Sequence, residues 1–136
     1  LRAFEFYMSQ KSNKIVVKGR RKNRRLTEVM FTFGMQIISW FVLKTYLNDI
    51  NAQPKLFSRQ FYQKYIQNNA PSDFSLDLYT MYQAKTNGMD IYEIPVLFTK
   101  RLFGEAKGGS GSSFKTKFNL IKRTFLYILK LRQNII

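Results

Sequence analysis

The spacing of apolar residues predicts two helices in the first part of the chain. Residues 1–11 and 28–47 have apolar side chains at helical spacing, and no charged residue occurs from Val29 to Leu43. About 20 apolar residues are needed to cross a bilayer, so the second segment falls short of a transmembrane helix. It is typical of a helix that is buried or that lies along a membrane surface.

The other segments predict an α/β order of elements. Runs of β-branched or alternating apolar residues predict short strands, in 14–17, 48–59 and 89–98. Helical spacing predicts further helices, in 60–68, 73–88 and 114–132. Asp73 is the expected N-cap of the second of these helices, and Gly88 is its expected end. The basic stretch 18–25 predicts a loop after the first strand.

The composition is that of a folded chain with a narrow choice of chemistry. Apolar residues make up 45% and aromatic residues 16% of the 136 positions, which is far more than disordered chains contain. The chain has no cysteine and no histidine. Disulfides, thiolate metal sites, the usual zinc sites and Ser-His or Cys-His nucleophile pairs are therefore excluded within this chain. Carboxylates, lysines and tyrosines remain for any catalysis.

The net charge of +15 indicates an anionic partner, and its distribution divides the chain into three parts. Residues 14–25 include seven basic residues and no acid, and residues 107–136 include seven more, again with no acid. Six of the eight acids lie between Asp49 and Glu105. Nucleic acid, lipid headgroups and phosphorylated substrates are all compatible with this pattern.

Carboxylates in the middle part are candidates for chemistry. Asp49 follows an apolar helix, where a desolvated carboxylate can act as a base, and Lys55 interrupts an otherwise apolar strand. The alternative for Asp49 is a turn that closes the helix. Asp73 and Asp77 are four residues apart on one predicted helix face. Such a pair can bind a sugar hydroxyl, although solvated helix faces show the same spacing.

Two basic segments near the C-terminus are candidates for contact with anions. In 101–118, glycines and serines are bracketed by Arg101, Lys107 and other cations, which suits a phosphate-binding loop, a linker or a mobile surface loop. The helix expected at 114–132 mixes aromatic with basic residues. It is typical of a membrane-surface helix, or of a helix that packs on a core and keeps a solvated basic face.

Taken together, these stretches resemble the C-terminal half of family 2 glycosyltransferases, the GT-A enzymes of the dolichol-phosphate mannosyltransferase type. The resemblance extends from about Ile15 to Leu131 and follows three segments in order: VVKGRR, NDINAQPKLFSRQFY and DFSLDLYTMYQAKTNGMDIYEIPVLFTKRLFGEAKGG. The second is similar to the family's D-x-x-x-G-x-K/R-L-F-x-R segment. Gln53 and Pro54 stand where that segment has its glycine, and Ala106 stands where the third has a serine.

The resemblance implies an α/β fold, namely the acceptor-side half of a GT-A domain at 1–112, followed by a basic amphipathic juxtamembrane helix at 113–136. Such enzymes transfer a sugar from a nucleotide-sugar donor to a lipid-phosphate acceptor such as polyprenyl phosphate, in cell-envelope or polysaccharide synthesis. The chain would then act at the cytoplasmic face of a membrane. Leu1 opens the chain in helical spacing without a methionine, so we expect a piece of a longer protein.

The resemblance also assigns roles to residues of this chain. It implies that Asp49 is the catalytic carboxylate, and that substrate is bound by Gln53, Lys55 and Asp77. The phosphate charges would be held by four basic residues: Arg20, Arg24, Arg101 and Lys107. The family's Mg2+ or Mn2+ ion is bound by an Asp-x-Asp motif in the nucleotide-binding half. That half would precede Leu1, so we expect no metal ligands here and no activity from this chain alone.

Two other functions compete with the transferase. A nucleic-acid-binding module would suit the charge and the 22 aromatic residues (13 Phe, 8 Tyr and 1 Trp), but it calls for aromatic residues interleaved with basic ones. Here the densest aromatic runs lie on apolar helix faces, and we expect no nucleic acid partner. A membrane-surface adaptor without catalysis is the second alternative.

Overall fold

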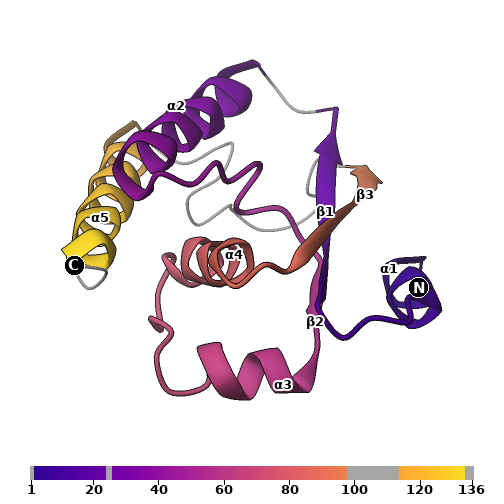
Figure 1. Ribbon diagram of the computed structural model, residues 1–136. Coiled ribbons are helices and arrows are strands. Elements are labelled where there is room, and N and C mark those ends of the chain that lie inside the picture. The colour runs from indigo at the N-terminus through magenta and orange to yellow at the C-terminus, as the bar shows by residue number, and fades with distance from the viewer. Residues whose placement is uncertain (1, 24–25, 98–113, 134–136) are drawn as a thin grey trace. The chain divides into compact units, whose positions relative to one another are not determined.

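A computed structural model describes residues 2–23, 26–97 and 114–133 of the chain. The protein is an α/β protein, as the order of elements predicted, and the described residues form one mixed three-stranded sheet (Figure 1). The described elements are α1 (Arg2–Ser9), β1 (Ile15–Lys22), α2 (Leu26–Leu43), β2 (Lys55–Phe57), α3 (Arg59–Phe61), the π-helical turn η1 (Tyr62–Ile66), α4 (Leu76–Thr86), β3 (Asp90–Leu97) and α5 (Phe114–Gln133).

β1 is the central strand of the sheet. It pairs antiparallel with β2 and parallel with β3, in the order β2-β1-β3. Ile15, Val16 and Val17 are almost completely buried, as suits β-branched residues in a strand with neighbours on both sides. The loop prediction for residues 18–25 is wrong for residues 18–22, which continue β1. β3 pairs with β1 along its whole length, so the backbone of the basic residues is hydrogen-bonded in the sheet.

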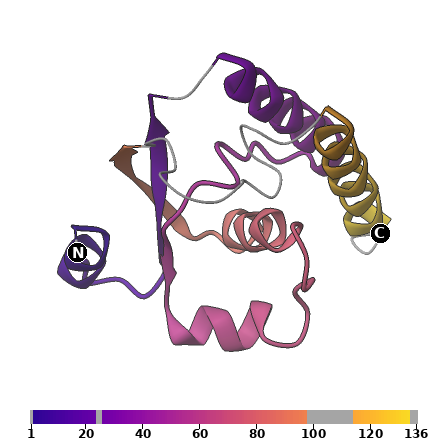
Figure 2. The ribbon, with the colours of Figure 1, turned by 180° about the vertical axis from the view of Figure 1, so that it is seen from behind.

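Helices cover both faces of this sheet (Figures 1 and 2). On one face α1 packs against β1 and β2, and its Phe6 ring lies 5.4 Å from the Tyr92 ring of β3. On the other face lies α4, whose residues Leu78, Met81 and Ala84 are buried. Along the chain, α3 and η1 lie between β2 and α4, so the predicted helix at 60–68 is confirmed, with a π-helical second part.

The ends of α4 differ in how well the sequence predicted them. The Asp73 carboxylate accepts the Ser75 backbone N–H at 2.9 Å, which makes a turn ahead of the helix, and α4 itself begins at Leu76. Asp73 is therefore not the N-cap. At the other end Gly88 has a φ of 65°, the left-handed conformation that ends many helices, as predicted.

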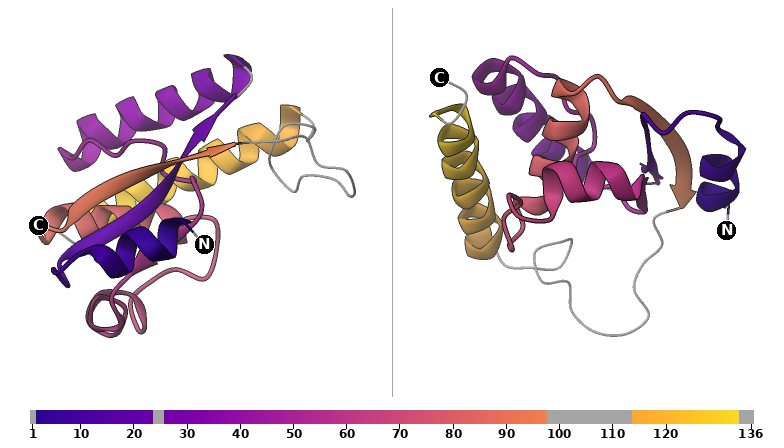
Figure 3. Two further views of the ribbon diagram at one scale, coloured as in Figure 1. Left: turned by 90° about the vertical axis from the view of Figure 1, so that its right-hand side faces the viewer. Right: turned by 60° about the horizontal axis from the view of Figure 1, so that its bottom comes forward.

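The contacts divide the chain into two compact units. The first, the sheet unit, contains α1, the three strands, α3, η1 and α4. The second, the helix pair, contains α2 and α5, which lie side by side (Figure 3). The α2 helix ends earlier than predicted because Lys44 takes a left-handed φ of 51°. The predicted domain boundary at 112–113 lies outside the described residues.

Within residues 2–23, 26–97 and 114–133, no helix is both long enough and apolar enough to cross a membrane.

Candidate functional site

A buried ion pair lies at the centre of the sheet. Lys18 of β1 and Glu93 of β3 are partners in the parallel register, and Lys18 Nζ is 2.9 Å from Glu93 Oε1. Only 2% of the Lys18 side chain is exposed. A buried charge is costly unless it is paired, so this ion pair allows a lysine to occupy the buried middle of the central strand. Arg20 is mostly exposed, and its Nε lies 3.9 Å from the other oxygen of Glu93.

A second charged group joins β2 to the first turn of α4. Lys55 donates to Asp77 Oδ1 at 2.7 Å and to the Ala52 carbonyl oxygen at 3.0 Å. Gln53 donates its amide N–H to both oxygens of the same carboxylate, at 3.1 and 3.3 Å. Asp77 also lies near the N-terminus of α4, where the helix dipole favours a negative charge.

Burial lowers the pKa of Lys55 below its model-compound value of 10.5, because it disfavours the charged ammonium. The hydrogen bond and the charge of Asp77 oppose this shift, and the nearby charge of Lys18 adds to it. The pairing with Asp77 therefore opposes the loss of the ammonium charge that burial favours. Asp77 and Gln53 are the more exposed members of the group and face the solvent.

Asp49 forms a third charged pair, with Arg21 at the end of β1. Its carboxylate accepts the Arg21 backbone N–H at 3.3 Å and the guanidinium Nε at 3.1 and 3.3 Å, and it also contacts Nη2. Asp49 is 5% exposed and has a φ of 37°, and its carbonyl oxygen accepts the Ala52 N–H at 3.0 Å. It thus lies in a turn, but this turn does not close the helix as the alternative predicted, because α2 already ends at Leu43. The Asp49 carboxylate is buried and held by Arg21.

The segment 49–54 takes the place of a strand beside the far end of β1. The last β1–β2 register pair is Lys18 with Lys55. Beyond it, Gly19 N donates to the Pro54 carbonyl oxygen at 2.8 Å, and Arg21 N donates to Asp49. The Gln53–Pro54 peptide bond is cis. A Cβ at Gly19 would lie 2.0 Å from the Gln53 carbonyl oxygen, so this close approach requires glycine.

The structure brings together four of the residues predicted to form the site. Asp49, Gln53, Lys55 and Asp77 all lie in the sheet unit, in two adjoining groups around β1 and β2. Arg20, on β1, lies beside Glu93 of β3. The other predicted phosphate-binding residues, Arg24, Arg101 and Lys107, lie outside the described residues.

Sequence reasoning missed three members of these groups: Lys18, Arg21 and Glu93. Lys18 directly follows the β-branched run 15–17, which predicts a buried strand. A lysine in a buried strand needs a carboxylate partner, and this signal could have identified Lys18. The alternating pattern of 89–98 places Glu93 on a predicted strand, and it does not show that this strand pairs with β1. Arg21 lies between two other basic residues in the sequence. Only the three-dimensional structure shows that Arg21, and not its neighbours, pairs with Asp49.

The three pairs form a polar patch in which each buried cation has a carboxylate partner. Its reachable groups are the Gln53 amide, the Asp77 carboxylate and the Arg20 guanidinium, which can bind hydroxyls and phosphates. Among the described residues, no group of three or more His, Cys, Asp or Glu side chains could hold a metal ion. Comparisons with protein-family models, curated proteins and solved structures find no match to this chain.

Proposed function

We propose that the chain is the acceptor-side half of a GT-A glycosyltransferase. It would transfer a sugar from a nucleotide-sugar donor to a lipid-phosphate acceptor such as polyprenyl phosphate, in cell-envelope or polysaccharide synthesis. The observation that supports this most is the meeting of Gln53 and Lys55 with Asp77. These residues come from two separate segments that resemble the family, and they share one hydrogen-bonded group.

The geometry supports a division of roles. The Gln53 amide and the Asp77 carboxylate offer a donor and an acceptor for sugar or acceptor hydroxyls, and Lys55 holds Asp77 in place. Arg20 is an exposed cation suited to phosphate. Arg24, Arg101 and Lys107 keep the same role as expectations from the resemblance.

Asp49 is the residue we assign to the chemical step, as a base toward the acceptor. Arg21 contacts both oxygens of its carboxylate, so proton transfer requires the guanidinium to release one of them. Because Asp49 is also buried, its carboxylate must become accessible to the acceptor at the same time.

A metal ion is part of this proposal but is not held by the residues described above. Mg2+ or Mn2+ neutralises the diphosphate leaving group in such reactions. The resemblance assigns its ligands to the nucleotide-binding half that would precede Leu1. In the experiments below, the full-length protein means this chain together with any residues that its reading frame adds at either end.

The test is a transfer assay with the full-length protein. Nucleotide sugars labelled in the sugar are offered with a short, water-soluble polyprenyl phosphate and Mg2+ or Mn2+. We expect label to appear on the polyprenyl phosphate with at least one donor. Absence of transfer with every donor, together with salt-dependent retention of single-stranded RNA, would favour the nucleic-acid alternative. Absence of both would favour the non-catalytic adaptor.

A further inference from the structure

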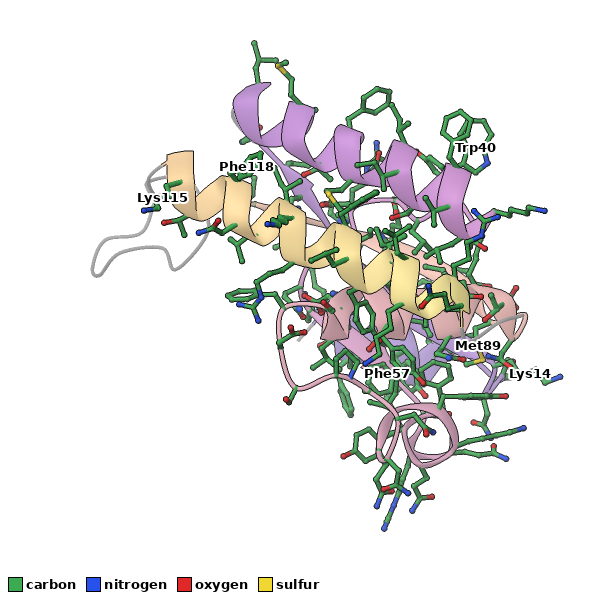
Figure 4. The ribbon with its side chains drawn as sticks, turned by 90° about the vertical axis from the view of Figure 1, so that its left-hand side faces the viewer. Lys14, Trp40, Phe57, Met89, Lys115 and Phe118 are labelled. Atoms are coloured by element: carbon green, nitrogen blue, oxygen red, sulfur yellow. The ribbon has the colours of Figure 1, made fainter. Side chains whose placement is uncertain are left out.

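The α2 helix exposes a row of large apolar side chains. Its exposed large side chains recur at steps of three, four and one residues, which places them on one helix face. We call this face the apolar stripe, and it contains Leu26, Met30, Phe33, Ile37, Trp40 and Phe41. Phe41 is 71% exposed and Trp40 is 54% exposed. Figure 4 shows Trp40 projecting from α2 on the side away from α5.

The inner face of the same helix includes buried polar side chains. Gln36 is buried and donates to Asn48 Oδ1 at 3.0 Å. Ser39 is completely buried, and its Oγ has no hydrogen-bond partner among the described residues. A helix on the surface of a water-soluble protein has the opposite arrangement, with polar residues outside and apolar residues inside. The α2 helix is therefore suited to an apolar environment on its outer side.

The charge of α5 identifies the kind of environment. α5 packs against α2, and its sequence contains no acidic residue. The exposed basic side chains of α5 are Lys115, Lys122, Arg123, Lys130 and Arg132. Among them lie the exposed apolar residues Phe118 and Leu126. Apolar and basic side chains on one unit match the acyl chains and the headgroups of an anionic bilayer.

A second copy of this chain fits the stripe less well than lipid does. Two copies joined through α2 would bring together two helix pairs that are both strongly basic, and like charges repel. An anionic bilayer gains from the same charges. Apolar insertion combined with a basic patch provides the two signals that stable membrane anchoring requires.

We propose that α2 is the membrane-inserting element, lying along an anionic bilayer with its apolar stripe among the upper acyl chains while the basic residues of α5 contact the headgroups. The sequence predicted membrane contact for residues 113–136 and left 28–47 as either a buried helix or a membrane-surface helix. The exposed side chains of α2 favour the second alternative and identify the face that enters the lipid. This inference goes beyond the transferase proposal, because it requires no sugar transfer.

Trp40 provides the test, since it is the only tryptophan among the 136 residues. The full-length protein is mixed with phosphatidylcholine vesicles that contain or lack phosphatidylglycerol. The emission of Trp40 is taken as the difference between the wild-type protein and the W40F variant. With anionic vesicles we expect the emission to move to shorter wavelengths, and we expect lipids brominated along the acyl chains to quench it.

Matched variants identify the surface. Phe33→Ser combined with Phe41→Ser removes two exposed rings of the stripe, and should weaken vesicle binding by roughly 10- to 100-fold. Phe4→Ser combined with Met8→Ser removes two similarly exposed side chains from α1 and should leave binding unchanged. Lys122→Gln and Lys130→Gln should each weaken binding to anionic vesicles by about fivefold.

Three outcomes would overturn the proposal. The first is a Trp40 emission that does not respond to anionic vesicles. The second is vesicle binding that survives the F33S/F41S change undiminished, which would leave α5 as the sole contact. The third is a lipid-free protein whose Trp40 is already shielded in a concentration-dependent oligomer, which would make a second copy the occupant. None of these readouts depends on sugar transfer, so failure here would leave the transferase proposal standing.

Discussion

The sheet unit and the helix pair place charged and apolar side chains in opposite ways. In the sheet unit, Lys18, Lys55 and Asp49 are buried among strands, and each has an oppositely charged partner. In the helix pair, α2 exposes rings such as Trp40 and Phe41 and buries Gln36 and Ser39. Buried charges held in fixed geometry are typical of a functional site, whereas an apolar outer face is typical of contact with a nonaqueous surface.

The largest effect is expected from breaking the central ion pair of the sheet unit. Glu93→Gln removes the carboxylate beside the buried Lys18 ammonium, and should lower the free energy of unfolding by roughly 3–5 kcal/mol. Urea unfolding of the full-length protein measures this change. The double variant K18M/E93Q should recover much of the loss, because an apolar pair needs no charge compensation. If E93Q alone unfolds like wild type, the ion pair is not important for stability.

A pair of glycine variants compares the two regions directly. Gly19→Ala places a Cβ against the Gln53 carbonyl oxygen, a backbone atom that cannot move easily, and should cost about 1–3 kcal/mol. Gly34→Ala lies in α2, where a new Cβ meets no atom within 4 Å, and should stabilise the helix by about 0.5–1 kcal/mol. Opposite signs in urea unfolding are the expected result. A neutral Gly19→Ala would contradict the close approach of the 49–54 segment to β1.

The smallest effect concerns pH. Because burial lowers the pKa of Lys55 in the folded state, the unfolded chain binds more protons than the folded one between that lowered pKa and 10.5. The Lys55 contribution to stability should therefore rise as pH increases through this alkaline window. Comparing wild type with Lys55→Met isolates the contribution, since other groups that titrate there are common to both. A difference that is constant with pH would mean that Lys55 titrates alike in both states.

The sequence predicted most of the elements, because periodicity is a local property. The strand at residue 15, the helix after residue 25 and the helix at 114–132 all follow from spacing alone. The continuation of β1 to Lys22 did not, since a basic run looks like a loop until β3 is known to lie beside it. The end of α2 depended on the left-handed backbone at Lys44, where no glycine marks the turn.

Residue type and spacing singled out Asp49, Lys55 and Asp77 as candidates for the site, and the resemblance added Gln53. Asp49, Gln53, Lys55 and Asp77 were named from their segments, and the structure brings them into adjoining groups. The pairing of Asp49 with Arg21 depends on how the 49–54 segment returns to β1, which no local pattern encodes. The exposed face of α2 could not be predicted from the sequence either, because a helix without charged residues does not show which of its sides packs against the protein.

The most direct test of the transferase proposal is the turnover of an Asp49→Asn variant of the full-length protein. The substitution keeps the size of the side chain and removes its charge and most of its basicity. With a short polyprenyl phosphate as acceptor, we predict that turnover falls by roughly 100- to 10,000-fold while nucleotide-sugar binding stays nearly intact. Asp73→Asn is the matched control, because its side-chain oxygen can still accept the Ser75 N–H. Wild-type turnover in D49N would show that Asp49 is only a turn residue and would contradict the assignment of the chemical step.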